Sequence, residues 1–169
     1  MPAIAKPWFT PVLEPDPKTA TDPERQAAVA AAPAPLPQDL RWTASHLRPE
    51  YRPVESWLEI DLLLMQLGEP DLPYVVVESR RMARFAQAMG ESDAMIIEVC
   101  SESGIPRPTV WRLRRAVALP YAELAVHSWE GAGVAAETLF TADEASVAFR
   151  SWLCEGALPS GATVERVVY

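Results

Sequence analysis

The side chains best suited to nucleophilic or acid–base chemistry are two cysteines, Cys100 and Cys154, and two histidines, His46 and His127. A Cys–His pair could act as nucleophile and base if the fold brought the two together. No motif in the sequence places one beside the other, and neither cysteine belongs to a Cys-x-x-Cys pair of the kind that holds zinc. Only seven glycines occur, which leaves little material for a phosphate-binding loop. We therefore expect no catalytic residues, no cofactor and no bound metal.

A second chemical candidate is the basic stretch "SESGIPRPTVWRLRRAV" at residues 101–117, which holds four arginines and no acid after Glu102. From Val99 to Val117 the chain resembles the helix-turn-helix of lactose-repressor-like and IclR-like regulators. Such a unit places its second helix in the major groove of DNA. The resemblance implies that Arg107, Thr109 and Arg112 face bases or phosphates.

The same stretch can also form a β-hairpin, in which "AMIIEVC" and "TVWRLRRAVAL" are strands and "ESGIPRP" is the turn. The β-branched Ile96, Ile97 and Val99 suit a strand better than a helix. Residues 121–169 carry seven acids and two bases, a balance that disfavours contact with phosphates. We favour the hairpin, although periodicity alone leaves both alternatives open.

The elements around this stretch are indicated by hydrophobic spacing and by helix start and stop signals. "PVESWLEIDLLLMQLGEP" predicts a helix that opens near Pro53. "LPYVVVES" at 72–79, "RMARFAQAMG" and "ATVERVVY" predict strands, although a short helix is the alternative for "RMARFAQAMG". "LPYAELAVHSWEGAG" predicts a further helix. The first helix is expected to turn a stripe toward the core, made of Val54, Trp57, Leu58, Leu62 and Met65.

The strongest local signal is "TLFTADEASVAFRSWLCEGALP" at residues 138–159. Thr141 and Glu144 form a capping box, T-x-x-E, which satisfies free backbone donors at a helix start. Gly156 is placed for a left-handed cap at the helix end. The residues expected to be buried between these two caps are Ala145, Ala148, Phe149, Trp152 and Leu153.

The distribution of proline residues divides the chain into two parts. Nine of the 17 prolines fall in residues 1–37, so we expect residues 1–38 to form an extended or disordered arm. Residues 39–169 are expected to form one α+β domain, an antiparallel sheet of about four to six strands packed against two or three helices.

The net charge of the chain is −8, which suits solubility or a basic partner. No signal peptide or membrane span is visible, and we expect a cytoplasmic protein without a membrane partner.

The order of these elements is similar to that of small immunity proteins of bacterial polymorphic-toxin systems. The similarity lies in Phe85 and Gln87 on one strand, Glu98 on the next, and a late helix followed by Gly156, Pro159 and a last strand. It implies a non-catalytic protein that occludes the active site of one cognate toxin, which would be basic. Under this resemblance the candidate partner contacts are Glu130, Glu137, Asp143, Glu144 and Glu155.

Overall fold

The computed structural model describes residues 35–44, 50–101, 109–119 and 134–167. Within them the fold is α+β, as the sequence predicted. An antiparallel sheet of eight strands, more than the four to six expected, has the order β2-β1-β3-β4-β5-β6-β8, and β7 pairs with β5 away from this path. The elements in chain order are β1 (Leu40–Thr43), β2 (Arg52–Pro53), α2 (Trp57–Met65), β3 (Tyr74–Ser79), β4 (Arg84–Glu91), β5 (Ala94–Ser101), β6 (Thr109–Arg114), η1 (Ala136–Thr138), β7 (Leu139–Phe140), α4 (Ala142–Arg150), η2 (Ser151–Glu155) and β8 (Thr163–Val167).

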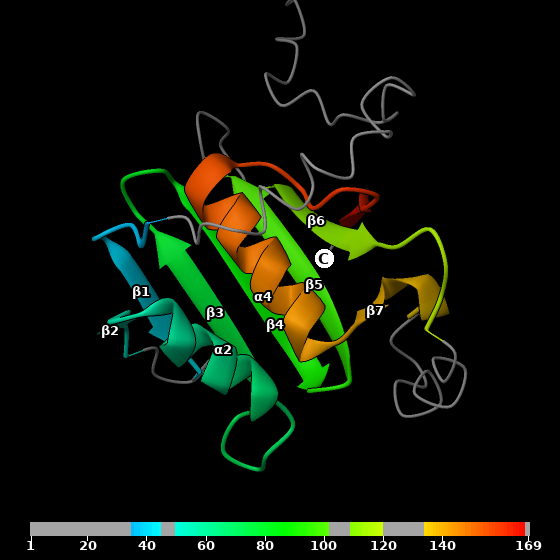
Figure 1. Cartoon of the computed structure of the whole chain (residues 1–169), viewed down its shortest axis with the longest axis horizontal. Coiled ribbons are helices and arrows are strands. Elements are labelled where there is room, and N and C mark those ends of the chain that lie inside the picture. Colours follow the sequence, from blue (N-terminus) through cyan, green and yellow to red (C-terminus); the bar gives the residue numbers. More distant parts are fainter. Residues whose placement is uncertain (1–34, 45–49, 102–108, 120–133, 168–169) are drawn as a thin grey trace, which may run out of the picture. The chain divides into compact units, whose positions relative to one another are not determined.

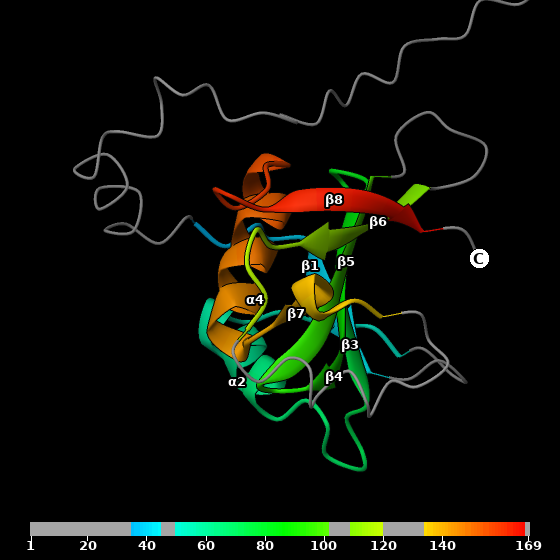
Figure 2. The same ribbon diagram turned by 90° about the vertical axis from the view of Figure 1, so that its right-hand side faces the viewer.

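The helices α2 and α4 lie side by side and form one layer on one face of the sheet (Figures 1 and 2). Side chains alternate between the two faces of a strand, so every second residue of β4 and β5 turns toward the helices. Ala86 and Ala88 on β4 pair with Val99 and Ile97 on β5, and all four are buried. Small residues on β4 leave room for the large buried side chains of α4, Phe149 among them.

The helix α2 begins four residues later than the sequence indicated. Ser56 is its N-cap, and the Ser56 hydroxyl accepts a hydrogen bond from the backbone nitrogen of Glu59 at 3.2 Å. Pro53, expected in the first helical turn, lies instead in β2 opposite Arg41. A Ser-x-x-Glu pattern at positions 56–59 is the start signal that marks the true boundary.

The face that α2 buries also differs from the expected one. Trp57, Ile60 and Leu64 are buried, at spacings of three and four residues. Leu58, Leu62 and Met65, which the sequence analysis placed in the core, point to solvent. The expectation was right for Val54 and Trp57, which are buried, and wrong for the other three. Leucine and isoleucine occupy almost the whole circumference of this helix, so spacing could not show which side meets the sheet.

The helix α4 follows the sequence closely. Both halves of the capping box between Thr141 and Glu144 are present, and all five residues expected to be buried are buried. The last turn widens into a π-helix, η2, and ends at Gly156 in the left-handed conformation with φ 70°. The two ends of this helix are therefore fixed by local sequence signals, and its middle is fixed by packing.

The described parts of the stretch that raised two alternatives pair as the two strands of the hairpin interpretation. β5 and β6 are antiparallel, with Glu98 opposite Arg112 and Val99 opposite Trp111. The helix-turn-helix interpretation is wrong for the described residues on either side of positions 102–108, because both segments are extended. The strands expected at 72–79, at "RMARFAQAMG" and at the end of the described chain are also present, as β3, β4 and β8.

Several expectations lie outside the described residues. They concern residues 1–34 of the proline-rich arm, the helix expected in "LPYAELAVHSWEGAG", and the side chains of His46, Arg107, His127 and Glu130. Among the described residues, no helix is long and apolar enough to cross a bilayer.

Candidate protein-binding surface

Four of the five acids expected to contact a partner lie in the described residues, on three different elements. Glu137 lies in η1, Asp143 and Glu144 lie in the first turn of α4, and Glu155 lies at the end of η2. Asp143 and Glu155 are therefore at opposite ends of the helical segment that α4 and η2 form. Asp143 and Glu155 are exposed, whereas Glu137 and Glu144 are partly covered. The structure thus separates these candidates, and their roles have to be judged one by one.

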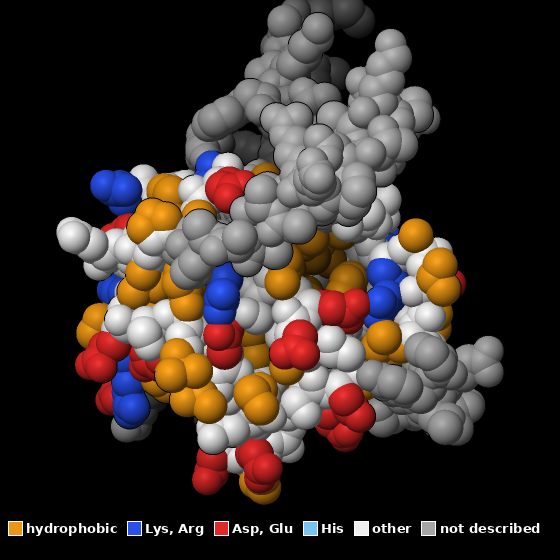
Figure 3. Space-filling model, in the orientation of Figure 1, with side chains coloured by type: hydrophobic (Ala, Val, Ile, Leu, Met, Phe, Trp, Pro, Cys, Tyr) orange, Lys and Arg blue, Asp and Glu red, His pale blue; other side chains and the backbone are white. Residues whose placement is uncertain are grey.

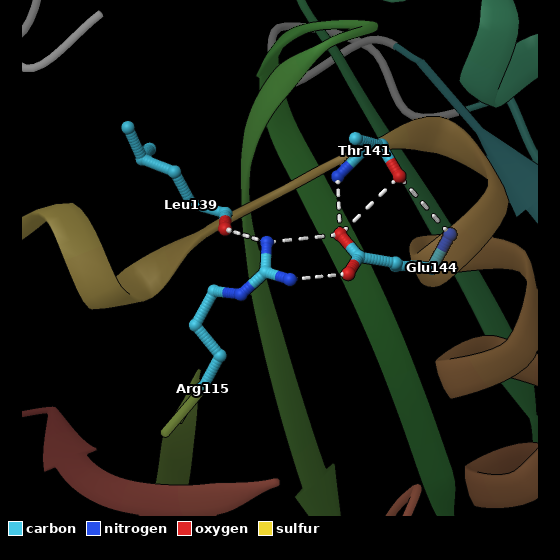
Figure 4. A network of polar contacts seen from close by, with 4 residues as sticks. All are labelled: Arg115, Leu139, Thr141 and Glu144. Atoms are coloured by element: carbon cyan, nitrogen blue, oxygen red, sulfur yellow. Dashed lines mark hydrogen bonds and ion pairs between the residues drawn. The ribbon is translucent and has the colours of Figure 1, made fainter. Parts of the chain in front are cut away.

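Glu144 stabilises the start of α4 (Figure 4). Its carboxylate accepts hydrogen bonds from Nη1 and Nη2 of Arg115 at 3.2 and 2.6 Å, and from the backbone nitrogen of Thr141 at 2.9 Å. Arg115 also donates to the carbonyl oxygen of Leu139, at 3.4 Å. A carboxylate with this many fixed donors would lose them on turning to a partner, so Glu144 is a structural residue.

Arg112, the expected DNA contact, is also used inside the fold. Its Nε and Nη2 both approach Oε1 of Glu98, at 3.1 and 2.9 Å. Gln87 donates to the other oxygen of Glu98 at 2.6 Å. The Glu98 side chain is fully buried and that of Arg112 is 15% exposed. Thr109 begins β6 next to Ser101. The described part of the basic stretch is therefore a strand in which Arg112 is already paired, in place of a recognition helix.

The acids on α2 have specific partners within the described residues. Asp61 accepts a hydrogen bond from the Ser146 hydroxyl of α4 at 2.5 Å and pairs with Arg150 of the same helix. The Arg150 guanidinium lies over the Trp57 ring, 5.5 Å from its centroid. Ser146 contacts Asp61, whereas Arg150, later on α4, lies over Trp57, earlier on α2. The two helices therefore run antiparallel. Asp61 is thus the residue that joins them.

The outward face of α2 carries a row of exposed apolar side chains, which we call the α2 apolar stripe: Leu58, Leu62 and Met65. Their exposed fractions are 64%, 47% and 62%. The spacings of four and three residues put all three on one side of the helix. Val147 of the neighbouring α4 is 54% exposed as well. Single exposed leucines are ordinary on protein surfaces, but an aligned row is typical of a binding site.

Acidic residues flank the α2 apolar stripe along the chain. Figure 3 shows hydrophobic side chains gathered over α2, with several acidic and a few basic side chains beside them. Between Arg52 and Arg80 the chain has no lysine or arginine, and the acids of that stretch are Glu55, Glu59, Asp61, Glu69, Asp71 and Glu78. Of these, Glu55, Glu69 and Asp71 are exposed. The surface is therefore apolar in the middle and negative at its edge, and sequence analysis missed it by assigning the stripe to the core.

The cysteines give little support to an enzyme site. Burial raises the pKa of the Cys154 thiol, the nearby Glu155 raises it further, and Arg150 only partly opposes this. The thiol is therefore protonated at neutral pH and a poor nucleophile. Cys100 is fully buried. No three His, Cys, Asp or Glu side chains come together in a metal-binding group anywhere in the described ranges.

Comparison of the chain with protein-family models, with curated proteins and with solved structures found no match.

Proposed function

We propose that this chain is a non-catalytic protein-binding domain, and specifically an immunity protein that neutralises a basic bacterial toxin by occluding the toxin's active site. The observation that carries the proposal is the exposed α2 apolar stripe with acidic side chains at its edge. Burial of aligned leucine and methionine side chains supplies affinity, while the surrounding carboxylates supply electrostatic steering.

The rest of the described structure suits a rigid binding scaffold. The polar groups with the most elaborate contacts hold elements together: Glu98 joins three strands, Glu144 joins α4 to Arg115 just after β6, and Asp61 joins α2 to α4. A face held in this way changes little on binding, which lowers the entropic cost of association. A toxin that acts on nucleic acid presents a basic cleft, the complement of this acidic face.

The test is to co-express the chain with the protein encoded by each adjacent gene and to measure both growth and binding. One neighbour should arrest growth when expressed alone, and the chain should restore growth and form a 1:1 complex with it by calorimetry. The association rate should fall as salt is raised, because exposed charges are screened. If no neighbouring product is toxic, or if a toxic one is neither bound nor neutralised, the proposal is wrong.

A further inference from the structure

We infer that the α2 apolar stripe is the docking site and that its occupant is a basic amphipathic helix of the partner, with apolar residues along one face and Lys or Arg on both flanks. This inference rests on the proposed function and names the surface and the chemistry of the bound segment. Leu58, Leu62 and Met65 span about 10 Å of α2, two helical turns. A partner helix laid against α2 offers anchors at matching spacings.

The second helix extends this surface. Ser146 of α4 reaches Asp61 of α2, and Val147, the next residue along α4, is exposed like Leu62. Asp143 lies one turn before Val147 and is exposed on the same side of α4. Among the expected partner contacts that the structure describes, Asp143 is thus the acid that lies beside exposed apolar side chains.

Charge decides between the possible occupants. Two copies of this chain facing each other through the stripe would bring the exposed Glu55 and Glu69 toward the acids of the other copy, a like-charge arrangement that opposes association. Anionic lipid headgroups would be repelled for the same reason. A helix flanked by lysine or arginine instead pairs with these carboxylates while its apolar face covers the leucines.

The test uses a defined probe, a synthetic amphipathic helix of leucine and lysine, with leucines at i, i+3, i+4 and i+7 and lysines on both flanks. Calorimetry gives its affinity for the full chain, and amide chemical shifts locate its binding. We expect the shifts to concentrate on α2 and α4. Leu62→Asp should weaken binding at least ~10-fold, the loss expected of an interface anchor. The same peptide with glutamate in place of lysine should not bind.

The matched control is Val117→Asp, because Val117 is 75% exposed but lies after β6, outside the stripe. It should bind the probe like the wild type. Far-ultraviolet circular dichroism should show both variants folded, since both substituted side chains are exposed. Equal affinities of the two variants, or equal binding of the glutamate peptide, would overturn the inference. So would concentration-dependent dimerisation of the wild type that Leu62→Asp abolishes, because a second copy would then occupy the stripe.

The same variants separate this inference from the proposed function. If the probe docks on α2 but no neighbouring gene product is neutralised, the docking surface stands and the immunity function fails. If a neighbouring toxin binds Leu62→Asp as tightly as it binds the wild type, the function stands and the assigned surface is wrong.

Discussion

Arg112 on β6 directs both Nε and Nη2 to one oxygen of Glu98 on β5, and the Glu98 side chain is completely buried. The two residues face each other across the strand pair. This pair gives Arg112 a structural role within the sheet, because an arginine that balances a buried carboxylate cannot also reach a base.

Arg112→Ala is expected to destabilise the fold strongly. The substitution leaves Glu98 buried without its positive partner, which typically costs about 3–5 kcal/mol of unfolding free energy. Urea denaturation followed by tryptophan fluorescence measures the loss. Arg166→Ala is the control, since Arg166 is exposed on β8, and it should change stability by less than about 0.5 kcal/mol. A stable Arg112→Ala protein that had lost binding to DNA would instead favour a nucleic-acid function.

The start of α4 should respond to two substitutions in different ways. Thr141→Ala removes the hydroxyl that accepts from the backbone nitrogen of Glu144, and should cost about 1 kcal/mol, the typical value for a helix N-cap. Glu144→Gln keeps an oxygen for the Thr141 backbone but loses the charge that pairs with Arg115. Raising the salt concentration should therefore narrow the stability difference between wild type and Glu144→Gln, and leave the effect of Thr141→Ala unchanged. If salt changed the stability losses of Thr141→Ala and Glu144→Gln by the same amount, the ion pair with Arg115 would not be the source of the effect of Glu144→Gln.

Gly156 and Gly161 form a matched pair for a test of steric strain. Both have positive φ, 70° and 79°, so alanine at either position incurs the left-handed penalty of roughly 1–2 kcal/mol. A Cβ at Gly156 would also lie 2.5 Å from the Arg84 guanidinium, whereas a Cβ at Gly161 meets open space. Thermal unfolding should show the larger loss for Gly156→Ala.

The collision can be isolated with a double-mutant cycle. In an Arg84→Ala background, the cost of Gly156→Ala should fall toward that of Gly161→Ala, because the three nearest atoms, all from the Arg84 guanidinium, have been removed. Arg84 itself should contribute, since it donates to the Trp152 carbonyl near the helix end at 3.4 Å and places a positive charge there. If the stability losses of Arg84→Ala and Gly156→Ala simply add in the double variant, the two sites do not interact. The guanidinium would then move away from the new Cβ without cost.

Asp39 should make stability depend on acid pH. Burial raises the pKa of this carboxyl, but hydrogen bonds from the Arg81 backbone nitrogen and the Ser79 hydroxyl outweigh it and hold the pKa below the ordinary value of 3.8. A lowered folded-state pKa contributes stability that is present above pH 3.8 and lost as the pH falls through the folded value. The stability difference between wild type and Asp39→Asn should therefore narrow below about pH 4.

The measurement is a series of urea denaturations from neutral to acid pH. Asp71→Asn removes an exposed acid of the same type and serves as the control for the general effect of net charge. The stability difference between wild type and Asp71→Asn should not narrow at acid pH. If it narrows as much as the difference between wild type and Asp39→Asn, the hydrogen bonds to Asp39 are not the cause.

Short sequence patterns correctly identified those elements whose ends or conformation depend on neighbouring residues. The Thr141–Glu144 capping box and Gly156 fixed both ends of α4, and β-branched residues in Ile96–Val99 correctly favoured a strand over a helix. A similar signal at Ser56–Glu59 was present but was overlooked in favour of Pro53. These features depend on backbone donors and φ angles within a few residues, so the chain order alone can reveal them.

The binding surface could not be found in this way. Leu58 and Leu64 are the same residue type on the same helix, and one is exposed while the other is fully buried. Their difference depends on where α4 and the sheet lie relative to α2, and the contact between Asp61 and Ser146 spans 85 positions of the chain. The same limit applies to the acids expected at the interface, because Glu144 pairs with Arg115, which is 29 positions away and follows β6.

By itself the sequence determined the α+β class, the acidic charge, the hairpin preference and the caps of α4, since each follows from the properties of neighbouring residues. Only the tertiary structure decided which side of α2 faces solvent and which carboxylates remain available to a partner. The physical reason is that burial and ion pairing depend on residues brought together from far apart in the chain. The apolar residues of α2 are also spread so evenly around the helix that their spacing is compatible with more than one buried face.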